Sequence, residues 1–380
     1  MTEKLYYKDA YIKSFTAKVL SCEKISDGYE AVLDKTAFFP EEGGQYADTG
    51  RIGDCIVTDV READGIIYHK LSSPIAVGES VIAELDFDER FEKMQCHTAE
   101  HILSGLFHSL YGVENVGFHL GGEDVTMDIS RPLAWEELIR VEQLANQAVF
   151  DNIKVISTFP DASELPSLEY RSKLDITEGV RLVNIEGYDS CACCAPHVGY
   201  TGEIGLIKIL DAVKMRGGMR LTITAGKRAY RVIKNAFDNL GVISRALSVP
   251  KLETGEAVLR SLAVAEEYKN ELKSLRISTV VREAERIEGC EGNLVRVFDG
   301  ADYDGLIAAA NKLSPRVSGF TVLLSGADGS YKYVISSNNC DMRAEIKKIN
   351  AALCGRGGGS SVMAQGNFTT VLTEIEKYFS

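Results

Sequence analysis

A long helical pattern between Glu253 and about Ile287 constrains the fold of this chain most strongly. Apolar residues recur there at steps of three and four among charged residues, which is the spacing of an amphipathic helix. A helix of this length predicts a linker between domains, and its apolar stripe predicts a homodimer seam, although it holds few heptads. The stripe consists of Val258, Leu262, Ala265, Tyr268, Leu272 and Leu275.

The segments on either side of this helix differ from each other in pattern. The first carries short runs of β-branched and aromatic residues between turn signals, which is typical of a small barrel. The next mixes helical and strand patterns, and the last alternates strands with helices around a glycine-rich loop at 355–359. We therefore expect an α+β protein in four parts: a small N-terminal β-barrel (1–87), an α+β domain (88–240), a helical linker (241–289) and a C-terminal α/β domain (290–380).

Composition narrows the class of protein further. Of the 380 residues, 45% are hydrophobic and 26% charged, which is typical of globular domains. No apolar run is long enough for a membrane span or a signal peptide, so we expect a cytoplasmic protein. The formal net charge of -13 argues against sequence-blind binding of nucleic acid.

One segment departs from this acidic average and is basic. Between residues 208 and 234 the sequence has eight basic residues and a single acidic one, Asp211. This segment predicts either a track for RNA phosphates or a solvated basic helix and hairpin. The cations are Lys208, Lys214, Arg216, Arg220, Lys227, Arg228, Arg231 and Lys234.

Two histidines give the first chemical signal. His97 and His101 lie four residues apart on a helix predicted from Asp88 to about Leu110, so their side chains can ligate one ion. Thr98 stands where a zinc protease has its glutamate, which disfavours that class.

A cysteine-rich run supplies further donors for a metal. Cysteines without an export signal are more often reduced thiols or metal ligands than disulfides. The run Cys191-Ala-Cys-Cys-Ala-Pro-His197 gathers thiols and an imidazole in one tight turn, and zinc prefers such ligands. The natural zinc ligands are His97, His101, Cys193 and His197, with Cys191 and Cys194 as alternative thiolates.

These motifs resemble a known family. H-x-x-x-H followed about ninety residues later by C-x-x-x-H is similar to the editing domain of alanyl-tRNA and threonyl-tRNA synthetases. The segment 36–50 (TAFFPEEGGQYADTG) resembles the neighbouring barrel motif, and 193–198 (CCAPHV) resembles C-G-G-T-H-V. The segment 355–365 (GRGGGSSVMAQ) resembles the glycine-rich loop of the domain that closes alanyl-tRNA synthetases and many DHH phosphoesterases.

The chain is therefore identified as similar to the AlaX family of stand-alone alanyl-tRNA editing proteins, in its longer form. No aminoacylation core fits before Tyr6, and no D-H-H motif supports a phosphoesterase. The resemblance implies hydrolysis of tRNA(Ala) mischarged with serine or glycine. The alternative is a zinc-stabilised tRNA-binding module without catalysis.

The resemblance also implies roles for individual residues. Glu100 would be a general base or else a solvated helix residue, and Gln45 would act at the editing cleft. Four protein ligands would close the zinc tetrahedron, so either one ligand is loose or an unbound water attacks. The family's pocket glutamine is missing from 116–122. We expect the pocket to use Gly43, Gly44, His119 or Thr126, and tRNA to contact Arg216, Arg220, Lys227, Arg228, Arg356, Gly357 and Gly358.

Overall fold

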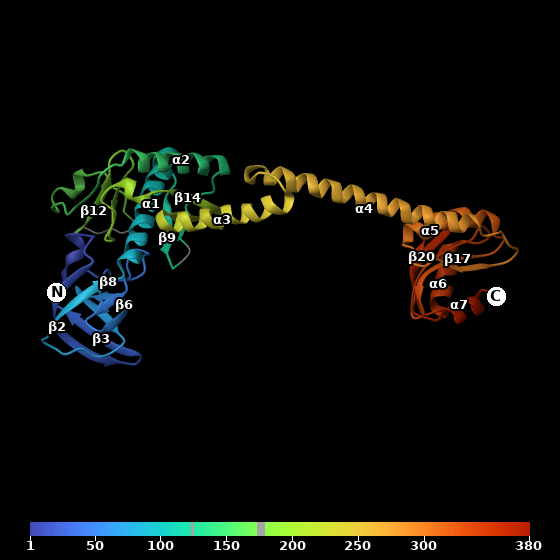
Figure 1. Ribbon diagram of the computed structural model, residues 1–380, viewed down its shortest axis with the longest axis horizontal. Coiled ribbons are helices and arrows are strands. Elements are labelled where there is room, and N and C mark those ends of the chain that lie inside the picture. The colour runs from blue at the N-terminus through green and yellow to red at the C-terminus, as the bar shows by residue number, and fades with distance from the viewer. Residues whose placement is uncertain (123–124, 173–178) are drawn as a thin grey trace. The chain divides into compact units, whose positions relative to one another are not determined.

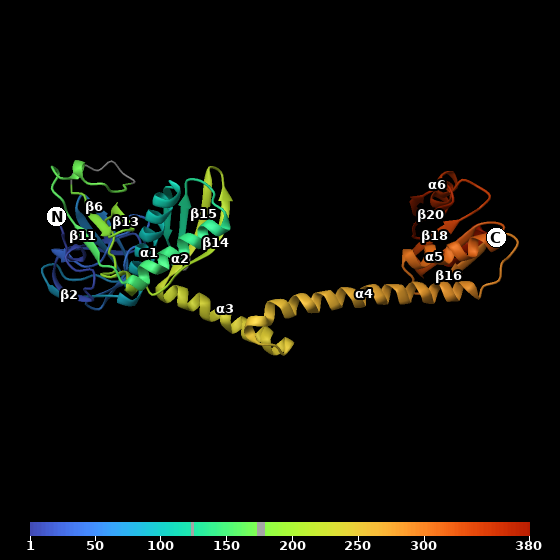
Figure 2. The same cartoon turned by 90° about the horizontal axis from the view of Figure 1, so that it is seen from above.

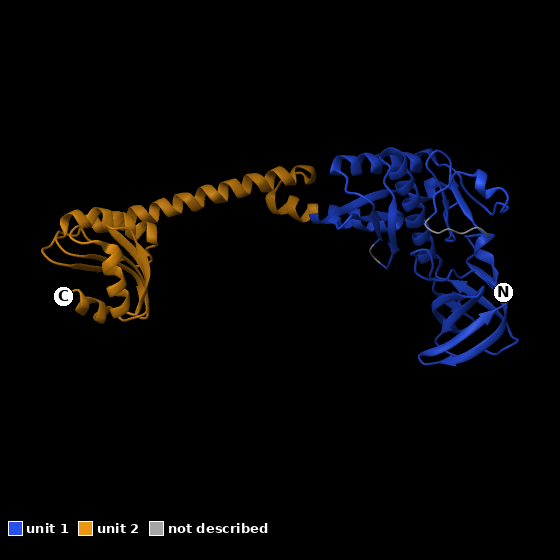
Figure 3. Cartoon of the chain, turned by 180° about the vertical axis from the view of Figure 1, so that it is seen from behind, with its two compact units in different colours: residues 1–239 blue, residues 240–380 orange. Residues whose placement is uncertain are grey.

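The computed structural model describes residues 1–122, 125–172 and 179–380. It divides into two compact units, Met1–Asn239 and Leu240–Ser380 (Figure 3). Helices and sheets occur in both, which confirms the α+β class, while the expected division into four parts stays a prediction. None of the described helices is both long and apolar enough to cross a membrane.

The N-terminal strands close into a barrel in the order β2-β3-β7-β6-β5-β8 (Figure 1). Buried and exposed residues alternate along most of these strands, as a sheet with one interior face requires. A short strand β1 (Glu3–Lys4) pairs with β4 (Lys35–Thr36) beside the barrel. The barrel strands are β2 (Ser14–Ile25), β3 (Gly28–Leu33), β5 (Gly50–Ile52), β6 (Cys55–Ala63), β7 (Ile66–Leu71) and β8 (Ser80–Leu85).

The rest of the first unit is built around helix α1 (Phe87–Tyr111). α2 (Trp135–Asp151) lies beside α1, and an antiparallel sheet of order β14-β15-β10-β9 packs on it (Figure 2). A second sheet has the order β11-β12-β13. The strands are β9 (Asn115–Leu120), β10 (Val125–Ile129), β11 (Val155–Thr158), β12 (Leu182–Ile185), β13 (Asp189–Ala192), β14 (Ile207–Met215) and β15 (Gly218–Ala225).

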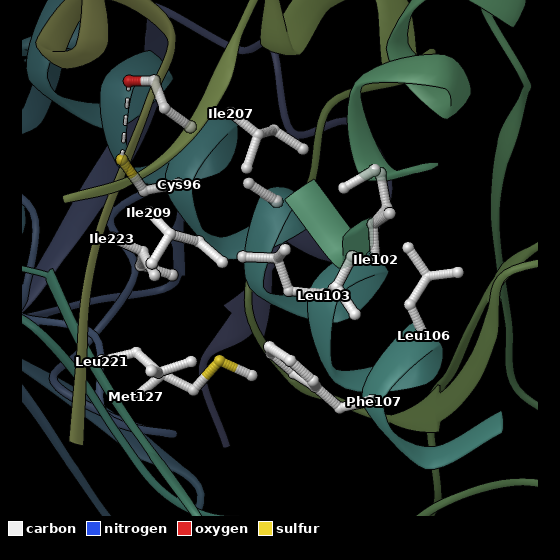
Figure 4. Packing of buried hydrophobic residues seen from close by; sticks show 14 of the residues in the cluster. Cys96, Ile102, Leu103, Leu106, Phe107, Met127, Ile207, Ile209, Leu221 and Ile223 are labelled. Atoms are coloured by element: carbon white, nitrogen blue, oxygen red, sulfur yellow. Dashed lines mark hydrogen bonds between the residues drawn. The ribbon is translucent and has the colours of Figure 1, made fainter. Parts of the chain in front are cut away.

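Helix α1 is enclosed on all sides rather than along one stripe. Every residue from Lys93 to Phe107 is buried, because α2, β9, β13 and β15 surround the helix. Figure 4 shows Leu103 and Phe107 packed against Met127 and Leu221. Leu110 lies past the last packed turn, and its side chain is 40% exposed.

The barrel is joined to α1 by a buried ion pair. Arg90 donates from Nε to Asp48 Oδ2 at 2.8 Å, and its Nη2 donates to the carbonyl of Ala37 at 2.6 Å. Asp48 also accepts from the amide of Phe39 at 2.7 Å. The family-like segment 36–50 therefore contains a structural anchor besides its site residues.

The second unit contains a long helix and an α/β domain. α3 (Gly226–Leu247) runs into it from the first unit, and α4 (Thr254–Glu285) matches the helix expected from the sequence. The sheet order is β16-β17-β18-β20-β19, with α5 over β17 and β18 and α6 against β19. The elements are β16 (Leu294–Val297), α5 (Tyr303–Leu313), β17 (Thr321–Ala327), β18 (Ser330–Ser336), α6 (Met342–Ala352), β19 (Gly355–Gly359), β20 (Met363–Phe368) and α7 (Leu372–Tyr378).

The expected glycine-rich loop is instead the edge strand β19, so this prediction is wrong. Alternate glycines are required by close packing, because a Cβ on Gly357 would collide with the hydroxyl of Tyr333 and the carbonyl of Gln365. A run of glycines is a poor signal for a strand, since glycine weakens strands in general. Only the crowded face explains why this strand needs them.

Candidate metal centre

Four donors from two segments meet beside α1. His97 and His101 project from the middle of the helix, while Cys193 and His197 come from the loop that follows β13. Their ligand atoms all lie within 4.8 Å of one another. Cys193 Sγ is 3.6 Å from His97 Nε2 and 3.4 Å from His197 Nε2. This cluster could hold a metal ion, and a thiol with three imidazoles is a donor set that suits zinc.

The outer nitrogen of each imidazole faces its own oxygen partner. His97 Nδ1 lies 3.0 Å from Gln45 Oε1, and His101 Nδ1 lies 3.0 Å from Asp189 Oδ2. His197 Nδ1 lies 3.0 Å from the hydroxyl of Thr98.

These contacts fix the protonation of the rings. Amide and carboxylate oxygens can only accept, so Nδ1 carries the proton in His97 and His101. The Thr98 hydroxyl donates to the carbonyl of Met94 at 2.8 Å, so it accepts from His197. In each ring Nε2, rather than Nδ1, is then the nitrogen that faces the cluster, which is the arrangement that supporting contacts produce at metal sites.

Charge in the cluster favours metal binding by Cys193. Burial opposes ionisation of its thiol, but the neighbouring histidines outweigh burial and hold the pKa of Cys193 well below its usual value. Burial lowers the pKa of His197 to about 3, so that ring stays neutral. Burial also disfavours a charged His101, yet contacts with Asp189 and Cys193 raise its pKa well above the usual value. A thiolate and a neutral imidazole are the forms that bind metals, so Cys193 and His197 are already in those forms, while a metal bound here would displace a proton from His101.

The two other cysteines of the run differ from Cys193. Burial raises the pKa of Cys191 to about 11, and burial likewise raises that of Cys194. Cys191 forms a second possible metal-binding group with His101 and Asp189. In that group, however, Arg171 already binds both oxygens of Asp189, at 2.7 and 3.0 Å. The geometry therefore favours Cys193 as the thiolate ligand.

Glu100 is buried, so the alternative of a solvated helix residue is wrong. Its carboxylate accepts from the hydroxyl of Ser104 at 2.6 Å and from the amide of Asn115. One carboxylate oxygen lies 4.0 Å from His101 Nε2. The structure therefore places Glu100 in a polar network behind the ligands rather than among them.

The segment from Gly43 to Gln45 docks on the edge of β9. The amide of Leu120 donates to the carbonyl of Gly44 at 2.7 Å, and a Cβ on Gly44 would collide with the carbonyl of Phe118. A glycine is needed there for close approach. Gln45 is fully buried, and its Nε2 has no hydrogen-bond partner among the described residues.

The expected pocket residues His119 and Thr126 lie elsewhere. They are paired across β9 and β10, on the opposite face of the sheet from buried Leu120 and Met127, which pack toward α1. His119 Nε2 lies 3.1 Å from the hydroxyl of Tyr46 instead. The structure does not bring these two residues to the four candidate metal ligands.

The basic track expected from the sequence is largely neutralised. Arg220 pairs with Asp128, and Lys227 pairs with Asp88, both at 2.7 Å. Arg228 is buried and donates to the carbonyl of Gly121 at 2.9 Å. Acids from distant segments therefore neutralise much of the expected phosphate track, which stays a prediction. Arg216, at the exposed tip of the β14–β15 hairpin, stays a candidate contact.

The supporting residues Asp189, Arg171 and Thr98 escaped sequence reasoning. Thr98 lies between the two histidines and could have been noticed from its position alone. Asp189 and Arg171 carry no spacing signal, because their roles depend on how β13 passes α1. That passage requires Gly105, where a Cβ would collide with the carbonyl of Tyr188.

Two family models match the chain. The threonyl and alanyl tRNA synthetase second additional domain matches residues 180–221, which include Cys193 and His197. The class II (A) tRNA synthetase model matches residues 1–89, the barrel region. In these two segments the chain is therefore similar to class II tRNA synthetases and to their second additional domain.

Relatives cover nearly the whole chain. The alanyl-tRNA editing protein AlaX-L of Pyrococcus horikoshii is 29% identical over 99% of this chain and 96% of its own length. The alanine–tRNA ligase of Halorubrum lacusprofundi is 32% identical over 94% of this chain, which spans only 40% of the ligase. The C-Ala domain of Aquifex aeolicus alanyl-tRNA synthetase, a solved structure, matches 24% of this chain and 91% of its own length at 21% identity and a TM-score of 0.21. Over nearly its whole length the chain is therefore similar to an alanyl-tRNA editing protein of the AlaX family.

Proposed function

We propose that this protein is a trans-editing hydrolase that removes serine, and glycine as a second substrate, from mischarged tRNA(Ala). The observation that carries the proposal is the cluster of His97, His101, Cys193 and His197, whose ligand atoms all lie within 4.8 Å of one another. A relative that matches nearly the whole chain is named an alanyl-tRNA editing protein. The synthetase pocket that accepts alanine cannot strongly reject serine, which differs by an added hydroxyl. A second site is therefore needed to remove serine.

The reaction is hydrolysis of the ester between the amino acid and the terminal ribose. Water oxygen forms a bond to the carbonyl carbon, the bond from that carbon to the ribose oxygen breaks, and the ribose oxygen takes a proton. Zinc held by the four residues would supply Lewis-acid assistance to such a hydrolysis. Four protein ligands would leave no open position on a tetrahedral zinc. Either one of them loosens to admit water, or a water that is not bound to zinc attacks.

The residues around the ligands have separate tasks in this proposal. Gln45 holds His97 through its amide oxygen, and its unpartnered Nε2 is a donor for an oxygen of the substrate. A buried donor without a partner costs roughly 1 to 3 kcal/mol, so binding an oxygen there is favourable. Glu100 keeps the α1 network in place, as a positioning residue.

Release of serine tests the proposal directly. Ser-tRNA(Ala) should be hydrolysed rapidly with Ala-tRNA(Ala) spared, and His101→Ala should lose the activity because it removes a ligand and the partner of Asp189. Free serine is measured from labelled ester at low enzyme concentration. A folded, zinc-loaded protein that leaves the serine ester intact would instead be the tRNA-binding module. In that module a chelator should unfold the metal domain, whereas the hydrolase should keep its secondary structure.

We also propose that the chain forms a homodimer through α4. Of the residues in this 32-residue helix, only Thr254, Ala257, Val280 and Ala284 are buried. Leu272 and Leu275 lie on the apolar stripe and are 50% and 56% exposed. Such a stripe marks an interaction site.

Charge reversal of the apolar stripe tests the dimer. Leu272→Glu with Leu275→Glu should convert a dimer into a monomer in sedimentation equilibrium, because two apolar seam positions become charged. Leu259→Glu is the control: Leu259 is exposed too, but it follows Val258 directly and so lies off the stripe. A monomeric parent chain, or an equal effect of the control, contradicts the proposal.

A further inference from the structure

Arg181, the residue directly before β12, is a cation buried without a carboxylate. Its side chain belongs to the buried polar groups of the first unit, and the residue is only 7% exposed. In the described part of the chain its guanidinium donates to two main-chain carbonyls and to the hydroxyl of Ser157, so none of these acceptors carries a charge. Burying a cation costs free energy unless its contacts replace the lost hydration. The position of these acceptors shows what the contacts achieve.

Both carbonyls belong to the turn that carries two of the candidate metal ligands. Arg181 Nη1 donates to the carbonyl of Cys193 at 2.9 Å and to the carbonyl of Ala195 at 2.8 Å. A single NH₂ group, with one hydrogen for each carbonyl, therefore holds the two ends of a three-residue segment. This segment begins at one ligand, Cys193, and ends two residues before the other, His197.

The main chain of Arg181 holds the same turn. The amide of Cys193 donates to the carbonyl of Arg181 at 3.0 Å. Cys193 is thus held at its amide by the main chain of Arg181 and at its carbonyl by the side chain. Because both groups are fixed, the direction of the Cys193 side chain is restricted, and its Sγ lies 3.6 Å from His97 Nε2 and 3.4 Å from His197 Nε2.

The turn depends on such contacts because it belongs to no regular element. Residues 193–199 lie in no described helix or strand. Pro196 has no amide hydrogen to donate. Ala195 is fully buried, and a buried carbonyl needs a donor from the protein. The contact from Arg181 supplies that donor.

An arginine suits this task better than a simpler donor. Its planar fork fixes several acceptors relative to one another, whereas an ammonium group acts as a point charge. The other NH₂ group donates to Ser157 on β11 at 2.8 Å, and Cζ lies 5.5 Å from the centre of the Tyr7 ring. These two contacts hold the plane of the fork. Control of the turn therefore offsets the cost of burying the charge.

We infer that Arg181 is a positioning residue of the metal centre, whose guanidinium holds the Cys193–Ala195 turn so that Cys193 and His197 meet the two histidines of α1. It acts through these ligands and contacts neither the metal nor the substrate. The inference rests on the proposed function for the presence of zinc. It requires the fork itself, because a charge alone does not fix two carbonyls relative to each other.

The zinc affinity of the full chain, measured by competition with a chelator and without tRNA, tests this role. Arg181→Met should weaken zinc binding about 10- to 100-fold, the loss typical of a residue that supports a ligand. Arg181→Lys keeps the charge but not the fork, so it should also weaken binding, by about tenfold or more. Both variants should change the visible absorption spectrum of the chain loaded with Co²⁺. This spectrum reports the ligand geometry, which a loss of stability alone would leave unchanged.

Two variants serve as matched controls. Ser157→Ala removes one partner of the fork but leaves both carbonyl contacts. Arg140→Met removes an exposed arginine from α2 in the same unit. Both should bind zinc within about twofold of the parent chain, because substitutions away from buried contacts change little.

The outcomes separate this inference from the proposed function. An affinity and a Co²⁺ spectrum like those of the parent, in either Arg181→Met or Arg181→Lys, would overturn the inference even if serine is released. Equal losses in Arg140→Met, or a parent chain that binds no zinc, would overturn it as well. If Arg181→Met does not fold, Arg181→Lys decides alone. The expected losses in a chain without hydrolytic activity would support the inference and contradict only the hydrolase.

Discussion

Replacing Cys193 with alanine is expected to remove the metal and with it the release of serine. Cys193 is the group that the surrounding histidines favour as a thiolate, and its sulfur lies within 3.6 Å of the nitrogens of two of them. Loss of even a supporting residue typically costs 10- to 100-fold in metal affinity, so loss of a ligand should exceed about 100-fold. Elemental analysis and the serine-release assay measure the two effects.

Cys191→Ala is the matched control for this substitution. It removes a thiol from the same run, but one whose pKa burial raises to about 11, so that it stays protonated. Metal content and activity should change little. The reverse result, with zinc kept by Cys193→Ala and lost by Cys191→Ala, would move the thiolate ligand to Cys191.

The ligands could be predicted from sequence because their geometry is local. His97 and His101 lie one helical turn apart, and Cys193 and His197 lie in one turn, so spacing alone joins each pair. Only the meeting of the two pairs needed the fold or the family resemblance. The oxygen partners could not be predicted, because Gln45 and Asp189 reach α1 from the barrel loop and from β13.

The ion pairs around the expected RNA contacts could not be predicted, for a related reason. Charge is visible in a sequence, but its neutralisation is not: Arg220 and Lys227 find their acids about 90 and 140 residues away in the chain, at Asp128 and Asp88. The glycine-rich segment 355–359 was assigned to a loop for a different reason. Its composition suggests a loop, and only the packing of Tyr333 separates the structural Gly357 from the unconstrained Gly358.

Asp48→Ala is expected to destabilise the first unit by about 3 to 5 kcal/mol, because it leaves the Arg90 charge buried and unpaired. The side chains of Arg90 and Asp48 are 1% and 2% exposed, so water cannot replace the carboxylate. The amide of Phe39 would lose its acceptor as well. Denaturant unfolding of the full chain, followed by a probe of the first unit, measures the change.

An exposed ion pair of the same unit provides the comparison. Asp88→Ala removes the partner of Lys227, but Asp88 is 91% exposed, so the free energy of unfolding should change little. Asp48→Leu combined with Arg90→Met should recover part of the loss, since an apolar pair leaves no unpaired charge. A small change in Asp48→Ala, equal to that in Asp88→Ala, would mean that the buried pair does not join the barrel to α1.

Because Gln45 lies three residues before Asp48 and contacts His97, a loosened barrel should also weaken metal binding, which elemental analysis of Asp48→Ala would detect.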